Sequence, residues 1–262
     1  MPFTFSHAAA VWPLNKTRLE MPALIAGCFA PDFAYFFFLS PHGIAAHSLH
    51  GMFLYDLPLS LVALWLFYAY MQQPFNMFLP KGFRARLKPR GNGFTFWPPA
   101  RLALIVVSIL VGIATHLLWD SFTHTYYWPY RHWSFLRLPV SLPIEGNVHM
   151  YKVLQDGSSV FGLAVVAVWI WLWYRAAKPV ELPAANPYSR AQTWIIKVVM
   201  PALALGGALF KAYWDMGVPD VAFRPILHFA LDAGITVTTF FAIGLLICGA
   251  VFRSRVAVAE PV

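Results

Sequence analysis

Apolar residues gather into five runs, and each run is long enough, or nearly so, to predict a membrane-spanning helix. The runs cover residues 52–71, 102–119, 160–174, 194–214 and 227–252. A helix needs about 20 apolar residues to cross the hydrocarbon core of a bilayer. Inside that core a helix satisfies its own backbone polar groups. The pattern therefore predicts an all-α, polytopic helix bundle with about five spans.

A sixth stretch, residues 23–39, is apolar but shorter, and Pro31 and Asp32 interrupt it. The residue before a proline is disfavoured in helical geometry, so we expect a break at Ala30. We interpret this stretch as a short or re-entrant helix pair. If it crosses the membrane after all, the first twenty residues move to the other side and His7 cannot join a site on the external face.

Composition agrees with a membrane protein: 59% of the 262 residues are hydrophobic and only 11% are charged. Soluble domains have about a quarter of their residues charged. We expect one integral membrane domain over residues 1–262, with an N-terminal segment 1–50, core spans within 51–175 and two C-terminal spans within 194–252. The N-terminus lacks the basic and apolar pattern of a signal peptide. Cys28 and Cys248 predict neither a disulfide framework nor a thiolate metal site.

Basic residues set the expected orientation. Six of them and no acidic residue occur between Gln73 and Arg101, which predicts a cytoplasmic loop. Alternating from this loop, five spans place the N-terminus and the loop 120–159 outside and the C-terminus in the cytoplasm of a cell with an inner (plasma) membrane. The net charge of +8 then belongs to membrane-edge loops, and no interleaving of basic and aromatic residues indicates nucleic acid. The sequence leaves the oligomeric state open.

The strongest candidate chemistry lies where the second run ends. His116, Asp120 and His124 are spaced four apart, so a helix would place them on one face. Imidazole and carboxylate side chains suit zinc or a similar divalent ion. Ionisable residues near a span are costly and are functional candidates. The alternative is a histidine at the membrane interface, paired with an aspartate on its own helix.

Further histidines and aspartates precede the first clear span. Three histidines fall within nine residues, with an aspartate soon after; they are His42, His47, His50 and Asp56. They could equally be polar residues among the lipid headgroups. Asp32 follows Pro31 in an apolar stretch, where a carboxylate needs a partner or caps the next helix. His7 stands alone near the N-terminus.

The external loop adds an aromatic and basic run, residues 126–133. Its rings are typical of an interfacial aromatic belt, or of a surface that receives an amphipathic substrate such as a lipid. In the second case Arg131 and Arg137 are candidates to hold a phosphate. Glu145 and His149 further on are candidate metal, outer-sphere or proton-transfer groups, or ordinary loop residues.

Four segments carry a resemblance to a known family. They are Met-Pro-Phe-Thr-Phe-Ser-His, Ala-Pro-Asp-Phe, His-Ser-Leu-His-Gly and Thr-His-Leu-Leu-Trp-Asp-Ser-Phe-Thr-His. Together they resemble an uncharacterised family of bacterial multi-pass membrane proteins, known as a domain of unknown function, over residues 1–165. The order of histidines and aspartates is also similar to metal-dependent hydrolases of the bacterial inner membrane and, more distantly, to zinc-dependent phospholipase C. The chain lacks the N-terminal tryptophan of the mature phospholipases.

The resemblance and the spacings together predict a divalent-metal site, most simply for zinc. The expected ligands are His7, Asp32, His47, His116 and Asp120, with His42, His50, His124 and His149 as additional ligands or outer-sphere partners. Asp56 or Glu145 would transfer protons in the hydrolysis of a phosphoester or related bond in a lipid or envelope substrate. Two alternatives stay open: a transporter or ion-handling protein, and a non-catalytic scaffold with a structural metal.

Overall fold

We analysed a computed structural model of the full chain, which describes residues 3–40, 46–87, 94–143, 146–182, 186–217 and 223–256. Six helical segments in these ranges are long and apolar enough to cross a membrane. They confirm the all-α, polytopic class. The six segments are Met21–Phe38, Leu49–Asn76, Pro99–His132, Met150–Ala176, Arg190–Met216 and Pro225–Phe252.

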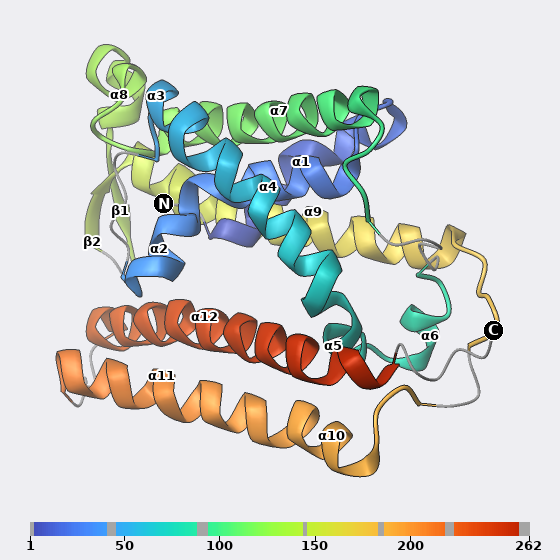
Figure 1. Ribbon diagram of the computed structural model, residues 1–262. Coiled ribbons are helices and arrows are strands. Elements are labelled where there is room, and N and C mark those ends of the chain that lie inside the picture. The colour runs from blue at the N-terminus through green and yellow to red at the C-terminus, as the bar shows by residue number, and fades with distance from the viewer. Residues whose placement is uncertain are drawn as a thin grey trace. The chain divides into compact units, whose positions relative to one another are not determined.

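The chain divides into two compact units. The first comprises Met1–Phe33, Gly43–Leu64 and Phe96–Trp173, and the second comprises Ala34–His42, Trp65–Thr95 and Tyr174–Val262. Figure 1 labels the helices and strands of both units.

The first unit contains the long helices α7 and α9 and the N-terminal elements. In chain order it has a 3₁₀ helix Thr4–Lys16, α1 Met21–Phe29, a 3₁₀ turn Ala30–Asp32, α3 Leu49–Gly51, a π-helical turn Met52–Asp56, the start of α4 Leu57–Leu66, α7 Pro99–Thr123, α8 Trp128–His132, a 3₁₀ helix Ser134–Arg137, strands β1 Pro139–Leu142 and β2 Gly146–His149, and most of α9 Met150–Ala176. The strands form an antiparallel hairpin with Pro139 opposite His149.

The N-terminal residues form a hairpin of helices along α7 (Figure 1). The 3₁₀ helix begins near Asp120, to which His7 lies close, and the turn after it contacts α7 at Ser108, whose hydroxyl accepts the Glu20 N–H at 3.0 Å. Helix α1 then returns along α7, so that Asp32 lies near Asp120 again. Residues 4–16 and α1 thus run in opposite directions beside the same helix.

Two glycines allow α1 and α7 to approach closely. A Cβ atom on Gly112 would lie 2.2 Å from the carbonyl oxygen of Leu24, and one on Gly27 would lie 2.1 Å from that of Ile109. Neither distance is compatible with a side chain, so both positions require glycine. The contact brings the backbone of α1 within reach of the side chains on α7. A small apolar core of Val11, Leu24 and Cys28 lies beside it.

Helix α9 begins ten residues earlier than the apolar run predicts. Its first turns carry Lys152, Gln155 and Asp156, which satisfy one another: the Lys152 ammonium lies 2.8 Å from Asp156 and 3.0 Å from the Gln155 side-chain oxygen. Because these polar groups pair along one helix face, the helix extends through residues that hydropathy alone assigns to the loop.

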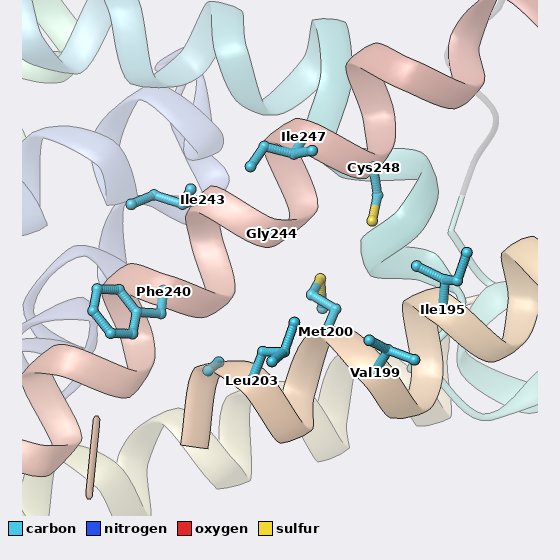
Figure 2. A pocket seen from close by; sticks show the side chains of 10 residues that line it. Ile195, Val199, Met200, Leu203, Phe240, Ile243, Gly244, Ile247 and Cys248 are labelled. Atoms are coloured by element: carbon cyan, nitrogen blue, oxygen red, sulfur yellow. The ribbon is translucent and has the colours of Figure 1, made fainter. Parts of the chain in front are cut away.

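The second unit is built around the antiparallel pair α11 and α12. Its elements are α2 Phe33–Phe38, a π-helical turn Phe67–Met71, α5 Gln72–Asn76, α6 Lys81–Arg84, α10 Arg190–Trp194, a π-helical turn Ile195–Val199, α11 Met200–Met216 and α12 Phe223–Val256. An apolar groove of about 340 Å³ lies between the pair, with Met200 beside Gly244 (Figure 2). Among the described residues that line the groove, Cys248 has the one ionisable side chain.

Lys211 and Asp215, four residues apart on α11, form an ion pair that belongs to a larger cluster. The Lys211 ammonium lies 2.6 Å from Asp215 and 3.1 Å from both carboxylate oxygens of Asp232. Asp232, four residues after His228, therefore pairs with a lysine of α11. His228 is exposed. The Lys211 ammonium thus links α11 to α12. Pairing with two carboxylates offsets the cost of placing charged side chains within apolar helices.

Candidate metal centre

Helix α7 presents the first two side chains of the site. His116 and Asp120 are one turn apart and fully buried, with 3.3 Å between His116 Nε2 and Asp120 Oδ2. The other ring nitrogen of His116, Nδ1, lies 2.7 Å from the carbonyl oxygen of Cys28 on α1. A carbonyl oxygen can only accept, so Nδ1 carries the proton of the neutral ring. Nε2 therefore directs its lone pair toward the carboxylates, as in metal-bound histidines.

Asp32 enters from the end of α1. The 3₁₀ turn Ala30–Asp32 forms where Pro31 interrupts the helix, and it points the carboxylate at α7. Asp32 Oδ1 lies 3.6 Å from His116 Nε2 and 3.4 Å from His47 Nε2. Its other oxygen accepts a hydrogen bond from the Thr4 hydroxyl at 2.6 Å. The carboxylate therefore faces the cluster and is oriented by the N-terminal segment.

His47 lies in the turn just before α3. Its Nε2 is 3.5 Å from Asp120 Oδ2, and its backbone carbonyl accepts a hydrogen bond from the Tyr127 hydroxyl at 2.8 Å. Ser48 caps the following helix by accepting the Gly51 N–H. The helix thus begins at Leu49, two residues after His47, so the histidine lies outside the helix and is directed into the core.

His7 completes the cluster from the N-terminal 3₁₀ helix. Its Nε2 lies 3.5 Å from Asp120 Oδ1, and its ring stacks on that of His116 with centroids 3.8 Å apart. Burial, and then the neighbouring His116, lowers the pKa of His7 to about 3. The ring is therefore neutral at physiological pH and offers a lone pair.

The five residues form two overlapping groups of metal-ligating atoms: His7, His116 and Asp120, and Asp32, His47 and His116. Nitrogen and oxygen ligands held at about 2.0–2.1 Å in a tetrahedron lie roughly 3.4 Å apart. The nitrogen–oxygen distances in the cluster, 3.3–3.6 Å, match that spacing. The arrangement has the size of a divalent metal site.

Several nitrogen and oxygen atoms of the cluster have no hydrogen-bond partner among the described residues. Within the described part of the chain, His7 Nε2, His116 Nε2, Asp32 Oδ1 and both oxygens of Asp120 make no hydrogen bond. Buried polar atoms without partners are costly and rare in folded proteins. A cation bound at their common centre would satisfy all of them. The buried cluster can therefore hold a metal ion.

Comparison with known proteins places the chain in a family. A family model described as "Domain of unknown function (DUF4184)" matches residues 1–251. The chain belongs to the DUF4184 family. No curated protein and no solved structure matches it.

The five ligands predicted from the sequence of this DUF4184 protein are the five that the structure brings together. The additional candidates differ. His50 is exposed and belongs to neither ligand group, and His149 is exposed on β2 with its Nδ1 3.1 Å from the Tyr130 hydroxyl. His42 and Glu145 lie outside the described residues.

His124 lies at the rim of the site, past the end of α7. Its Nδ1 is 3.0 Å from the backbone carbonyl of Asp120 and 3.7 Å from the Asp120 carboxylate. The carbonyl accepts the Nδ1 proton, so this nitrogen is not available as a ligand. His116 and Asp120 of the predicted column therefore lie in the cluster, and His124 belongs to neither group of candidate ligands.

Asp56, predicted to transfer protons, is completely buried beside the cluster. The π-helical turn Met52–Asp56 widens the helix where this side chain enters the interior, and such turns often accompany functional sites. His47, His116 and Asp32 lie close enough to act on it electrostatically. Neither Asp56 oxygen makes a hydrogen bond within the described residues. Asp56 is thus a further buried carboxyl group near the cluster.

The sequence did not predict the residues that support the ligands. The Cys28 carbonyl and the Thr4 and Tyr127 hydroxyls each orient one ligand. Gly162 of α9 also belongs to this support, since a Cβ there would lie 2.6 Å from the carbonyl oxygen of Ser6. Backbone acceptors and close approaches carry no local sequence signal, except that a glycine inside an apolar helix hints at a contact.

The Thr4 hydroxyl provides a test of this support. Thr4→Val removes the hydrogen bond to Asp32 while it keeps the size of the side chain, and we expect the affinity for zinc to fall by about 10-fold, at the lower end of the 10–100-fold that outer-sphere partners contribute. Competition with a fluorescent chelator measures the affinity. Thr17→Val in the same segment is the matched control, because the Thr17 hydroxyl contacts backbone atoms only. Equal affinities of the two variants would contradict the role of Thr4.

Proposed function

We propose that this chain is a membrane-bound, divalent-metal-dependent hydrolase, with zinc as the metal and a phosphoester or related bond of a lipid or envelope molecule as the target. One observation carries the proposal: more donors converge than a structural metal needs. A structural zinc site closes on four ligands, whereas a catalytic site keeps a position for water. The five predicted ligands form two groups of three that share His116, and the buried carboxyl of Asp56 lies close enough to them to interact electrostatically. An ion held by three of these side chains keeps a position for water, and the remaining side chains can bind that water or its proton.

A charge count gives Asp56 its role. Three buried carboxyl groups, those of Asp32, Asp56 and Asp120, carry three negative charges when all are ionised. Two are neutralised by one divalent ion when the imidazoles are neutral. The third is then balanced by a proton, and Asp56, which contacts none of the ligating atoms at ion-pair distance within the described chain, is the group that holds it.

The roles of the residues follow from this arrangement. His7, Asp32, His47, His116 and Asp120 would bind the ion. A bound divalent ion lowers the pKa of a water molecule toward neutrality and polarises a phosphoryl oxygen. Asp56, which holds the proton, would donate it to the leaving group and would recover a proton from water afterwards. The order of these residues, similar to that of zinc-dependent phospholipase C, supports the same chemistry. We place the site and the N-terminus on the external face of the plasma membrane, opposite the basic loop 73–101.

The proposal is tested by metal analysis and hydrolysis together. The purified full chain should contain about one divalent ion per chain by elemental analysis, and should hydrolyse bis(p-nitrophenyl) phosphate. Asp56→Asn should retain the metal and lower kcat by at least about 100-fold, because general acid–base groups contribute 10²–10⁴-fold. Asp156→Asn, which alters a half-exposed carboxylate paired with Lys152, is the matched control.

Three outcomes separate the competing functions. Absence of stoichiometric metal would refute both the metal centre and the metal-dependent hydrolase. Stoichiometric metal without hydrolysis of any phosphoester or acyl ester would indicate a scaffold with a structural ion. Hydrolysis that Asp56→Asn leaves unchanged would refute the role of Asp56 and retain the metal centre.

A further inference from the structure

The segment that follows α7 exposes arginines and aromatic rings side by side. We call it the arginine lip and define it as Trp128, Arg131, His132, Trp133 and Arg137. All five side chains are exposed, with Trp128 60% and Trp133 47% accessible. The residues come from α8 and the 3₁₀ helix Ser134–Arg137. Exposed tryptophans next to a span are typical of the headgroup region of a bilayer.

The two arginines are held together by the backbone. The Arg137 guanidinium donates a hydrogen bond to the carbonyl oxygen of Arg131 at 3.0 Å, and this fixes the second cation beside the backbone of the first arginine. The sequence has no acidic residue from 121 to 144. Within the described part of the chain neither arginine forms an ion pair. The lip is therefore a concentrated positive charge that an anion from outside the chain would balance.

The arginine lip is attached to the rim of the metal centre. Tyr127, the residue before α8, donates its hydroxyl proton to the carbonyl of His47, and the ring of Trp133 lies 5.4 Å from that of Phe122 on α7. His132 stacks on Trp128 with ring centroids 4.4 Å apart. These contacts hold the lip against the last turn of the helix that carries Asp120. A ligand bound by the lip would lie beside the end of α7 that carries Asp120.

We propose that the arginine lip binds the phosphate of an anionic glycerophospholipid and presents its headgroup to the metal centre. The guanidinium group of an arginine matches the geometry of phosphate oxygens, the lip carries two arginines, and the surrounding rings suit the interface between headgroup and acyl chain. The choice of a membrane lipid over free phosphate rests on the exposed tryptophans at the end of a span. The binding step stands by itself, whereas turnover of the bound lipid rests on the proposed function.

The test measures binding without turnover. The full chain in detergent, with its metal removed by a chelator, is titrated with short-chain phosphatidylglycerol, short-chain phosphatidylcholine and inorganic phosphate, and tryptophan fluorescence reports binding. We expect phosphatidylglycerol to bind at least about 10-fold more tightly than the other two. Each basic residue near an anionic membrane contributes roughly fivefold in affinity. Arg131→Gln should therefore weaken binding of phosphatidylglycerol by about fivefold, and the double variant with Arg137→Gln by about 20-fold.

Two variants keep the test decisive. Arg131→Gln leaves the bond from Arg137 to the backbone in place, so it tests the charge even where the double variant is less stable. Arg190→Gln removes an exposed arginine from the start of α10 and should change nothing. Equal binding of phosphatidylcholine, equal binding of inorganic phosphate, or an equal effect of Arg190→Gln would each overturn the proposal. A further outcome is a chain that binds phosphatidylglycerol selectively and yet hydrolyses nothing when it is loaded with metal. That result would support lipid binding by the arginine lip and refute the proposed hydrolase activity.

Discussion

Asp120→Asn is expected to abolish zinc binding, with a loss larger than the 10–100-fold that an outer-sphere partner contributes. Asp120 is the residue that faces the most histidines: its Oδ1 lies 3.5 Å from His7, and its Oδ2 lies 3.5 Å from His47 and 3.3 Å from His116. The amide keeps the size of the side chain but removes the negative charge that draws a cation into a buried site. The hydrolytic activity should disappear with the metal.

Thermal unfolding in the presence and absence of zinc measures this effect. A ligand that binds only the folded state stabilises it by about 2.7 kcal/mol at a concentration 100 times its Kd. The wild-type Tm should therefore rise with added zinc and fall with a chelator, and the Tm of Asp120→Asn should respond to neither. Asp215→Asn, in the exposed ion pair of the second unit, is the control and should respond as the wild type does.

A different chemistry for the same cluster gives a different result. If protonated histidines balanced the carboxylates, the wild-type Tm would be independent of zinc. Asp120→Asn would then destabilise the fold by about 3–5 kcal/mol whatever metal is present, as expected when one partner of a buried ion pair is removed. That outcome would exclude the metal centre and keep the cluster as a structural network.

The spacing and the resemblance predicted the five residues that the structure brings together, and two of the signals are local. His116 and Asp120 are four apart on a helix, and that spacing alone places them on one face. Asp32 follows a proline within apolar residues, which indicates both a break and a buried carboxylate. The prediction was less accurate where a helix begins. His47 and His50 are three residues apart, a spacing that would place them on one face of a helix, but the helix starts at Leu49, so only His50 belongs to it and is exposed.

The path of the N-terminus could not be predicted. We expected that a crossing by residues 23–39 would separate His7 from the site, yet the segment Met21–Phe38 is long enough to cross and His7 still reaches Asp120. The reason is the 3₁₀ helix Thr4–Lys16, which runs beside α7 in the direction opposite to α1. At about 2.0 Å per residue, its 13 residues are long enough to bring His7 back to Asp120. Its sequence has Pro13 and no clear apolar periodicity, and therefore gives no sign of a long helical segment.

Gly112→Ala is expected to lower both the stability of the fold and the affinity for metal. The new methyl group would lie 2.2 Å from the Leu24 carbonyl oxygen and 2.8 Å from the Cys28 nitrogen, and both are backbone atoms that cannot rotate away. Helices α1 and α7 would have to separate. Overpacking of this kind costs about 1–3 kcal/mol, whereas alanine in place of glycine within an unobstructed helix stabilises by about 0.5–1 kcal/mol.

The separation would also reach the metal centre, because the same two helices carry its ligands. Moving α1 away from α7 lengthens the bond from His116 Nδ1 to the Cys28 carbonyl and displaces Asp32 from His116. We therefore expect a fall in zinc affinity of about 10–100-fold, the range for lost outer-sphere contacts. An effect on stability without an effect on zinc affinity would show that the ligands adjust independently of the helix contact.

Gly206→Ala on α11 is the matched control, since a Cβ there meets no atom within 4 Å. The same exchange at that position should raise the free energy of unfolding slightly and leave zinc affinity unchanged. Chemical denaturation in detergent and chelator competition give the two quantities for both variants. A Gly112→Ala protein as stable as the Gly206→Ala protein would mean that α1 and α7 do not approach as closely as described, and the orientation of His116 by Cys28 would then lose its basis.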